Sequence, residues 1–114
     1  MSAAIERGQV DWVELDPTRS SELAKTRPCV VLSACEINQH RKTVVVIPLT
    51  TTPTPPAPPM LIAVPSAGAT SEARIEHIRA VDKSCLQRKL GALSAQDLKA
   101  IEDALRRVLR LPKA

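Results

Sequence analysis

The stretch WVELDPTRSSELAKTRPCVVLS, residues 12–33, is the part of this chain that says most about its fold. Two runs rich in valine and leucine flank a polar loop that opens at Pro17 and closes at Pro28. Such runs are typical of strands, and proline is tolerated at the first position of a strand. Arg27 then lies at the edge of the second strand, where a regular backbone can hold its guanidinium in place. The stretch therefore predicts a charged site on a fixed scaffold.

Alternating and continuous apolar runs predict further strands on both sides of the loop. Residues 43–49 (TVVVIPL) are almost entirely apolar, so this strand is expected to be buried on both faces and to end at Pro48. Residues 36–42 are expected to form a polar turn, 50–59 a stiff proline-rich loop and 65–71 a second turn. The other strands are expected at residues 9–16, 28–35, 60–64, 72–81 and 89–93.

One helix is expected at the end of the chain. Ser94 is a good N-cap, and Asp97 lies three residues later, as in a capping box. An apolar stripe at helical spacing follows, formed by Leu98, Ile101, Leu105, Val108 and Leu109, and Pro112 stops the helix. Five or six strands followed by a helix predict a mainly β protein, either a small barrel or a curled sheet with one packed helix.

The composition favours one small basic domain, residues 1–114, with an anionic partner. Lys and Arg number 16 against 12 Asp and Glu, which gives a formal net charge of +4. No apolar run is long enough to span a bilayer and the first residues do not form a leader, so a cytoplasmic protein without membrane association is expected. Trp12 is the only aromatic residue, so base stacking on aromatic side chains is not expected.

The three cysteines, Cys29, Cys35 and Cys85, lie in apolar surroundings and form no CxxC pair. They are expected to be buried, reduced thiols. No zinc site and no cofactor are expected.

Four blocks of the chain, in order, carry a more specific signal: residues 12–33, VIPLTT at 46–51, IEHIRAVDKSCL at 75–86, and SAQDLKAIEDALRRVLRL at 94–111. Together they resemble the MazF/PemK/Kid family of toxin endoribonucleases. The resemblance implies a CcdB/PemK-like SH3-like barrel with a C-terminal helix, assembled as a homodimer. It also implies cleavage of single-stranded RNA at short preferred sequences, without a metal, leaving a 2′,3′-cyclic phosphate and a 5′-hydroxyl. A cognate antitoxin with an acidic C-terminal tail would block the site.

Carried over residue by residue, the resemblance assigns Arg27 and Thr50 to the positions most often given catalytic roles, with Thr51 as the alternative to Thr50. Glu76 and Arg74 match an acid and an arginine with catalytic roles in one branch of the family. The residues expected to contact RNA are Arg19, Ser21, Lys25, Thr26, Thr51, Arg74 and His77. The chain departs from the family pattern in the first loop, where Ser20 and Lys25 replace two glycines, and next to Glu76, where His77 replaces a glutamine.

The chemistry of these side chains fits such a reaction. Cleavage of RNA without a metal needs a group to accept the 2′-hydroxyl proton, donors for the phosphate, and an acid for the 5′-oxygen. Arg27 can bind two phosphate oxygens at once but is a poor base. Thr50 can donate a hydrogen bond, and Glu76 can accept a proton. If residues 72–81 form a strand, Glu76 and His77 point to opposite faces.

Other interpretations stay open at this level. Arg27 could instead pair with Asp16 or Glu22, and Glu76 could be an ordinary exposed acid. A toxin of the same fold that binds DNA gyrase without cleaving anything, or an inactive nucleic-acid-binding barrel, would share much of the pattern. The combination of Arg27 with Thr50 argues against both.

Overall fold

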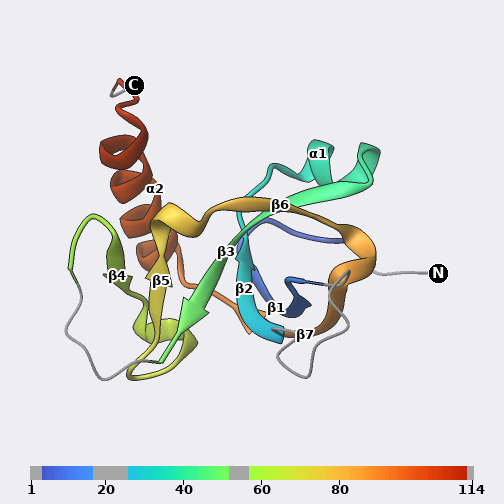
Figure 1. Ribbon diagram of the computed structural model, residues 1–114, viewed down its shortest axis with the longest axis horizontal. Coiled ribbons are helices and arrows are strands. Elements are labelled where there is room, and N and C mark those ends of the chain that lie inside the picture. Colours follow the sequence, from blue (N-terminus) through green and yellow to red (C-terminus); the bar gives the residue numbers. More distant parts are fainter. Residues whose placement is uncertain (1–3, 17–25, 52–56, 113–114) are drawn as a thin grey trace.

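The structure, a computed structural model, describes residues 4–16, 26–51 and 57–112 of the 114-residue chain. Its centre is an antiparallel sheet of seven strands, with neighbours in the order β4-β5-β3-β2-β1-β7 and with β6 also paired to β3. A long helix lies beside β4 and β5 (Figure 1). The strands are β1 Gln9–Glu14, β2 Thr26–Val31, β3 Thr43–Thr50, β4 Leu61–Ala63, β5 Glu72–Arg74, β6 Arg79–Asp82 and β7 Leu86–Ala92. The helices are α1 Cys35–His40 and α2 Ala95–Leu109.

The predicted mainly β fold with a C-terminal helix is confirmed, and the curled sheet agrees with an SH3-like barrel. The described residues form seven strands rather than five or six, because the segment expected as one strand at 72–81 is divided. β2 begins two residues before the expected Pro28. That difference matters because it places Arg27 inside the strand rather than at its edge.

Two aliphatic cores lie on opposite faces of the central strands. Val30 and Ile47 face α2, where Ile101 belongs to the same core. Cys29 and Val31 belong to the second core, which also contains residues of β1, β3 and β6. Neighbouring residues of a strand point to opposite faces, so alternate positions of β2 supply both cores. The expectation that β3 is buried on both faces is confirmed.

β3 changes partners along its length. Thr43–Val46 pair with β6, whereas Leu49 and Thr50 pair with β5. Pro48 lies between the two paired stretches and opposite Cys29 of β2. Pro48 itself is paired with neither β5 nor β6, so its missing N–H removes no hydrogen bond from those two ladders. The strand therefore continues past it. The expected end of the strand at Pro48 was therefore wrong, and Thr50 is the last residue of β3.

The expected strand at 72–81 was also wrong. β5 ends at Arg74, a 3-10 turn covers Ile75–His77, and β6 begins at Arg79. The turn carries the chain from one half of β3 to the other, since β5 and β6 pair with different ends of that strand. Ile75 is fully buried in the core beside α2, which fixes the turn against the helix.

Residues 36–42, expected as a polar turn, contain the short helix α1. Its Asn38 is buried, and the side-chain amide donates hydrogen bonds to the carbonyl oxygens of Ile5 and Ser33, at 3.3 and 3.0 Å. A buried amide needs such partners. These contacts hold the helix against the chain start and the end of β2.

The helix α2 begins as predicted. The Ser94 hydroxyl accepts a hydrogen bond from the backbone N–H of Asp97 at 3.1 Å. Asp97 itself does not complete a capping box, because its carboxylate accepts hydrogen bonds from the backbone N–H of Ser66, at 2.8 Å, and from the Ser66 hydroxyl. The start of the helix is thus joined to the segment that precedes β5.

Candidate active site

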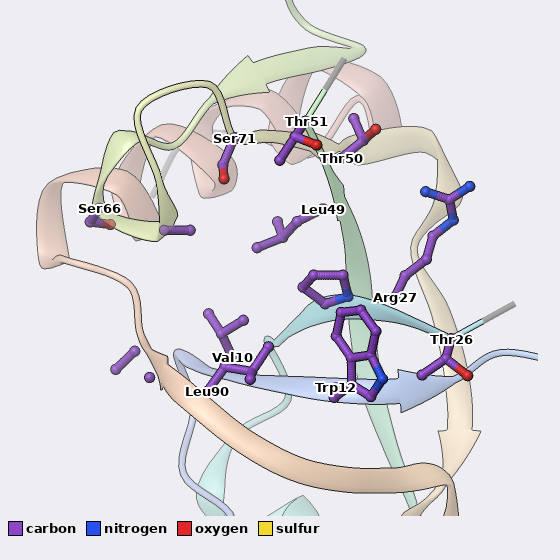
Figure 2. A pocket seen from close by; sticks show the side chains of 14 residues that line it. Val10, Trp12, Thr26, Arg27, Leu49, Thr50, Thr51, Ser66, Ser71 and Leu90 are labelled. Atoms are coloured by element: carbon purple, nitrogen blue, oxygen red, sulfur yellow. The ribbon is translucent and has the colours of Figure 1, made fainter.

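A pocket of about 570 Å³ opens between the ends of β2 and β3, the strand β1 and the segment that carries Ser66 and Ser71. Figure 2 shows the side chains that surround it. Its lining residues are Val10, Trp12, Thr26, Arg27, Pro28, Leu49, Thr50, Thr51, Ser66, Ala67, Ser71, Leu90, Gly91 and Ala92. Four residues that the sequence had singled out lie here, namely Thr26, Arg27, Thr50 and Thr51.

Arg27 and Thr50 are brought together by the pairing of β2 with β3. The last matched pair of these antiparallel strands is Cys29 with Pro48. Arg27 precedes Cys29 by two residues and Thr50 follows Pro48 by two, so the same register places them opposite each other and on one face. Figure 2 shows the Arg27 side chain extending from β2 toward the end of β3 that carries Thr50.

Two further threonines, Thr26 and Thr51, line the pocket together with Arg27 and Thr50. Thr26 begins β2 and is half-buried, and Thr51 follows β3 and is exposed. Thr50 is buried, with 8% of its surface exposed. The guanidinium and the hydroxyl groups together offer hydrogen-bond donors, and a phosphate accepts such bonds.

An apolar surface also lines the pocket. Trp12 lies opposite Pro28 in the β1–β2 register, and both line the pocket together with Leu90. Trp12 is 40% exposed although it is the only aromatic residue of the chain. Sequence reasoning missed this placement because it counted aromatic residues without pairing the strands. The register of WVELD against RPCVV would have placed Trp12 beside Pro28.

Hydrogen bonds at the start of α2 hold the wall opposite β2. The buried Asp97 accepts from the N–H and hydroxyl of Ser66, and the Ser66 oxygen accepts from the backbone N–H of Ser94 at 3.0 Å. Because one carboxylate accepts two hydrogen bonds, it orders both the start of α2 and the segment that carries Ser66. The wall is therefore fixed to the helix rather than to a free loop.

The second group of predicted residues does not line this pocket. Glu76 and His77 are exposed in the 3-10 turn after β5, and Arg74 is half-buried at the end of β5, opposite Leu61. The argument that Glu76 and His77 point to opposite faces of a strand was wrong, because a 3-10 turn has a period near three residues. Their roles stay predictions.

Several predicted residues lie outside the described part of the chain. They are Arg19, Ser20, Ser21, Glu22 and Lys25, together with part of the proline-rich segment, residues 52–56. Within the described ranges, Arg27 forms no ion pair with Asp16, since the ion pairs there join Arg7 to Glu102 and Asp103 to Lys99 and Arg106. The strand-edge pairing of Arg27 with Asp16 is thus not formed.

The three cysteines differ in burial. Burial raises the pKa of the Cys29 thiol to about 12, although the positive charges of Arg79 and Arg27 oppose the shift. Cys29 and Cys85 are buried and reduced, as predicted. Cys35 is exposed, contrary to expectation, because it begins α1 instead of ending a strand.

Two absences concern the described residues only. Residues 4–16, 26–51 and 57–112 contain no group of three or more His, Cys, Asp or Glu side chains placed to hold a metal ion. Over the same ranges, no helix is both long and apolar enough to cross a membrane.

Comparison with known proteins gives a consistent result. Residues 6–109 match the model of the PemK-like, MazF-like toxin of type II toxin-antitoxin systems. Endoribonuclease MazF9 of Mycobacterium tuberculosis is 31% identical over 110 residues, covering 90% of this chain and 93% of that protein. A solved endoribonuclease from a mycobacterial species superimposes with a TM-score of 0.80 at 28% identity, covering 100% of this chain and 99% of the other. A mycobacterial endoribonuclease in complex with its cognate antitoxin gives 0.78 at 27% identity, covering 99% and 100%.

Proposed function

We infer that this chain, which belongs to the PemK-like, MazF-like family of toxins of type II toxin-antitoxin systems, is an endoribonuclease. The observation that carries the proposal is the placement of Arg27 and Thr50 in a pocket that Trp12, Pro28 and Leu90 line with apolar surface. The guanidinium and the hydroxyl suit a phosphate and the apolar surface suits a base, which is what a nucleotide-binding groove requires.

In the proposed reaction Arg27 binds two non-bridging oxygens of the scissile phosphate and remains charged throughout. Thr50 donates its hydroxyl hydrogen to the same phosphate. The donors are held by paired strands, so they need little rearrangement as negative charge develops in the transition state. The cleavage is proposed to be independent of metal and to leave a 2′,3′-cyclic phosphate and a 5′-hydroxyl.

The substrate is proposed to be single-stranded RNA, read at a short preferred sequence. Trp12 and Pro28 offer a flat apolar surface on which an unpaired base can stack. Thr26 and Thr51 also line the pocket and can hydrogen-bond to the base or sugar. A base held there would leave its phosphate near Arg27.

The remaining predicted residues keep their proposed roles without a position in the pocket. Arg74 and His77 are proposed to contact RNA beyond the scissile phosphate, and Glu76 stays a candidate acid or base. Arg19, Ser21 and Lys25, which lie between β1 and β2 in the sequence, are also proposed to contact RNA. That assignment rests on the family resemblance alone.

The protein is proposed to act as a cytoplasmic homodimer that a cognate antitoxin inhibits. A solved relative at 27% identity is in complex with its cognate antitoxin. The net charge of +4 suits an antitoxin with an acidic C-terminal tail. Such a tail would compete with RNA for the part of the pocket that carries Arg27.

The experiment that tests the activity incubates the purified protein with single-stranded RNA in excess EDTA. We expect cleavage, with a cyclic phosphate on one product and a 5′-hydroxyl on the other. An absence of cleavage, or cleavage that appears only when a divalent metal is added, would reject the proposed function. Gyrase inhibition without RNA cleavage would favour the non-catalytic alternative.

A further inference from the structure

Glu72, the first residue of β5, is a buried acid beside the proposed phosphate site. Only 4% of its surface is exposed. A glutamate buried to this extent is usually paired, because removing its charge from water is unfavourable, and Glu72 does interact with another group of the protein. The sequence pattern gave no sign of this position, since a glutamate at the start of a strand is usually exposed.

The strand register places Glu72 directly opposite Thr50. The next pair along, Leu49 with Ala73, points into the core beside α2. Because neighbouring residues alternate, Thr50 and Glu72 point together to the other face. Side chains directly opposite each other on antiparallel strands have Cβ atoms about 4.5–5.5 Å apart.

The same row continues to Arg27 on the other side of Thr50. Extending the pairing of β2 with β3 by two residues from Cys29 and Pro48 sets Arg27 opposite Thr50. A cation, a hydroxyl and a carboxylate therefore follow one another across β2, β3 and β5. A phosphate bound to Thr50, which lines the pocket and is 8% exposed, would lie about one strand spacing from Glu72.

We propose that Glu72 is the general base of the cleavage reaction, an inference that rests on the proposed endoribonuclease function. Its carboxylate accepts the proton of the 2′-hydroxyl while the 2′-oxygen forms its bond to phosphorus. The bond from phosphorus to the 5′-oxygen breaks, and the 5′-oxygen takes a proton from water. The protonated Glu72 then returns its proton to the solvent, so atoms and charge balance.

This assignment supplies the function that Arg27 and Thr50 lack. An arginine stays protonated at neutral pH, and a threonine hydroxyl is a weak base, so a proton acceptor is still needed beside them. Neither Glu72 nor Glu76, the acid that the sequence suggested, is among the residues that line the pocket, and Glu76 is exposed in the 3-10 turn. Glu72 is the acid that the strand pairing joins to Thr50.

The test compares Glu72→Gln, Glu72→Ala and the control Glu36→Gln under single-turnover conditions with RNA in EDTA. Glu36 is an exposed acid in the first turn of α1. We expect Glu72→Gln to lower the cleavage rate constant by roughly 10²- to 10⁴-fold with little change in RNA affinity. Glu36→Gln is expected to cleave at the wild-type rate. Glu72→Ala is expected to recover activity as sodium formate is added, because formate supplies a carboxylate to the vacated space.

A purely structural role for Glu72 would not produce rescue by formate, so that readout separates the two roles even where a variant is less stable in thermal unfolding. A Glu72→Gln variant that cleaves within about threefold of the wild type, or a Glu72→Ala variant that formate does not rescue, would overturn the assignment. The wild-type reaction in the same experiment tests the proposed function. If the wild type does not cleave, the endoribonuclease proposal fails. If it cleaves and Glu72→Gln cleaves equally well, only the inference about Glu72 fails.

Discussion

Arg27 and Thr50 occupy facing positions on two neighbouring antiparallel strands, each two residues beyond the matched pair Cys29 and Pro48. Twenty-two residues separate them along the chain, yet both line one pocket. The sheet thus positions a guanidinium and a hydroxyl without relying on a loop.

Replacing Arg27 by alanine is expected to lower the cleavage rate constant by about 10³-fold, because the phosphate loses its charged, forked donor. Arg27→Lys keeps the charge but not the fork, so it should recover only part of the rate. The control is Arg41→Ala, an exposed arginine after α1. Single-turnover cleavage measures all three, and wild-type activity in Arg27→Ala would move the phosphate site elsewhere.

The hydroxyl of Thr50 can be removed with little change of shape by Thr50→Val. We expect a loss of about 10²- to 10³-fold in the rate constant, since one donor to the developing charge disappears. Thr50→Ser retains the hydroxyl and should keep most of the activity. Equal activities of the valine and serine variants would show that the hydroxyl is not used.

Trp12 is expected to act in binding rather than in the chemical step. Trp12→Ala should weaken RNA binding by about 1–3 kcal/mol, the usual contribution of one base stacked on an aromatic side chain, while the rate constant at saturation changes little. Trp12→Phe should bind nearly as well. Because Trp12 is the only tryptophan, its fluorescence should also change as an uncleavable oligonucleotide is added. Unchanged fluorescence and affinity would place the base elsewhere.

The cysteines provide a test that does not involve RNA. In the folded protein a thiol reagent at pH 8 should modify Cys35 rapidly, and Cys29 and Cys85 only after unfolding. The pKa of Cys29 is raised from 9.0 to about 12 in the folded state, so the folded protein holds this proton more tightly than the unfolded chain. The contribution to stability is complete below pH 9 and is lost as the pH rises toward 12. Rapid modification of all three thiols in the native state would contradict the buried position of Cys29.

Much of this fold could be predicted from local pattern. The N-cap Ser94, the apolar stripe of α2 and the apolar run of β3 depend on residues close together in sequence. The resemblance singled out Arg27 and Thr50, and both line one pocket, while their catalytic roles stay predictions. What the sequence did not reveal depends on pairing between distant segments.

β3 pairs with β6 before Pro48 and with β5 after it, and this exchange of partners divides residues 72–81 into two strands and a turn. The same exchange sets Glu72 beside Thr50, and the β1–β2 register sets Trp12 beside Pro28. Neither neighbour is visible in a single segment of sequence. Counting one aromatic residue could not show that it lines the site.

A double-mutant cycle of Arg27→Ala and Thr50→Val, measured as single-turnover RNA cleavage in EDTA, decides whether the two residues act on one phosphate. If they do, the double variant should lose little more activity than Arg27→Ala alone, because the second donor has no held phosphate to act on. Losses that multiply, to about 10⁵-fold or more in the double variant, would show that the residues act independently and would contradict the account.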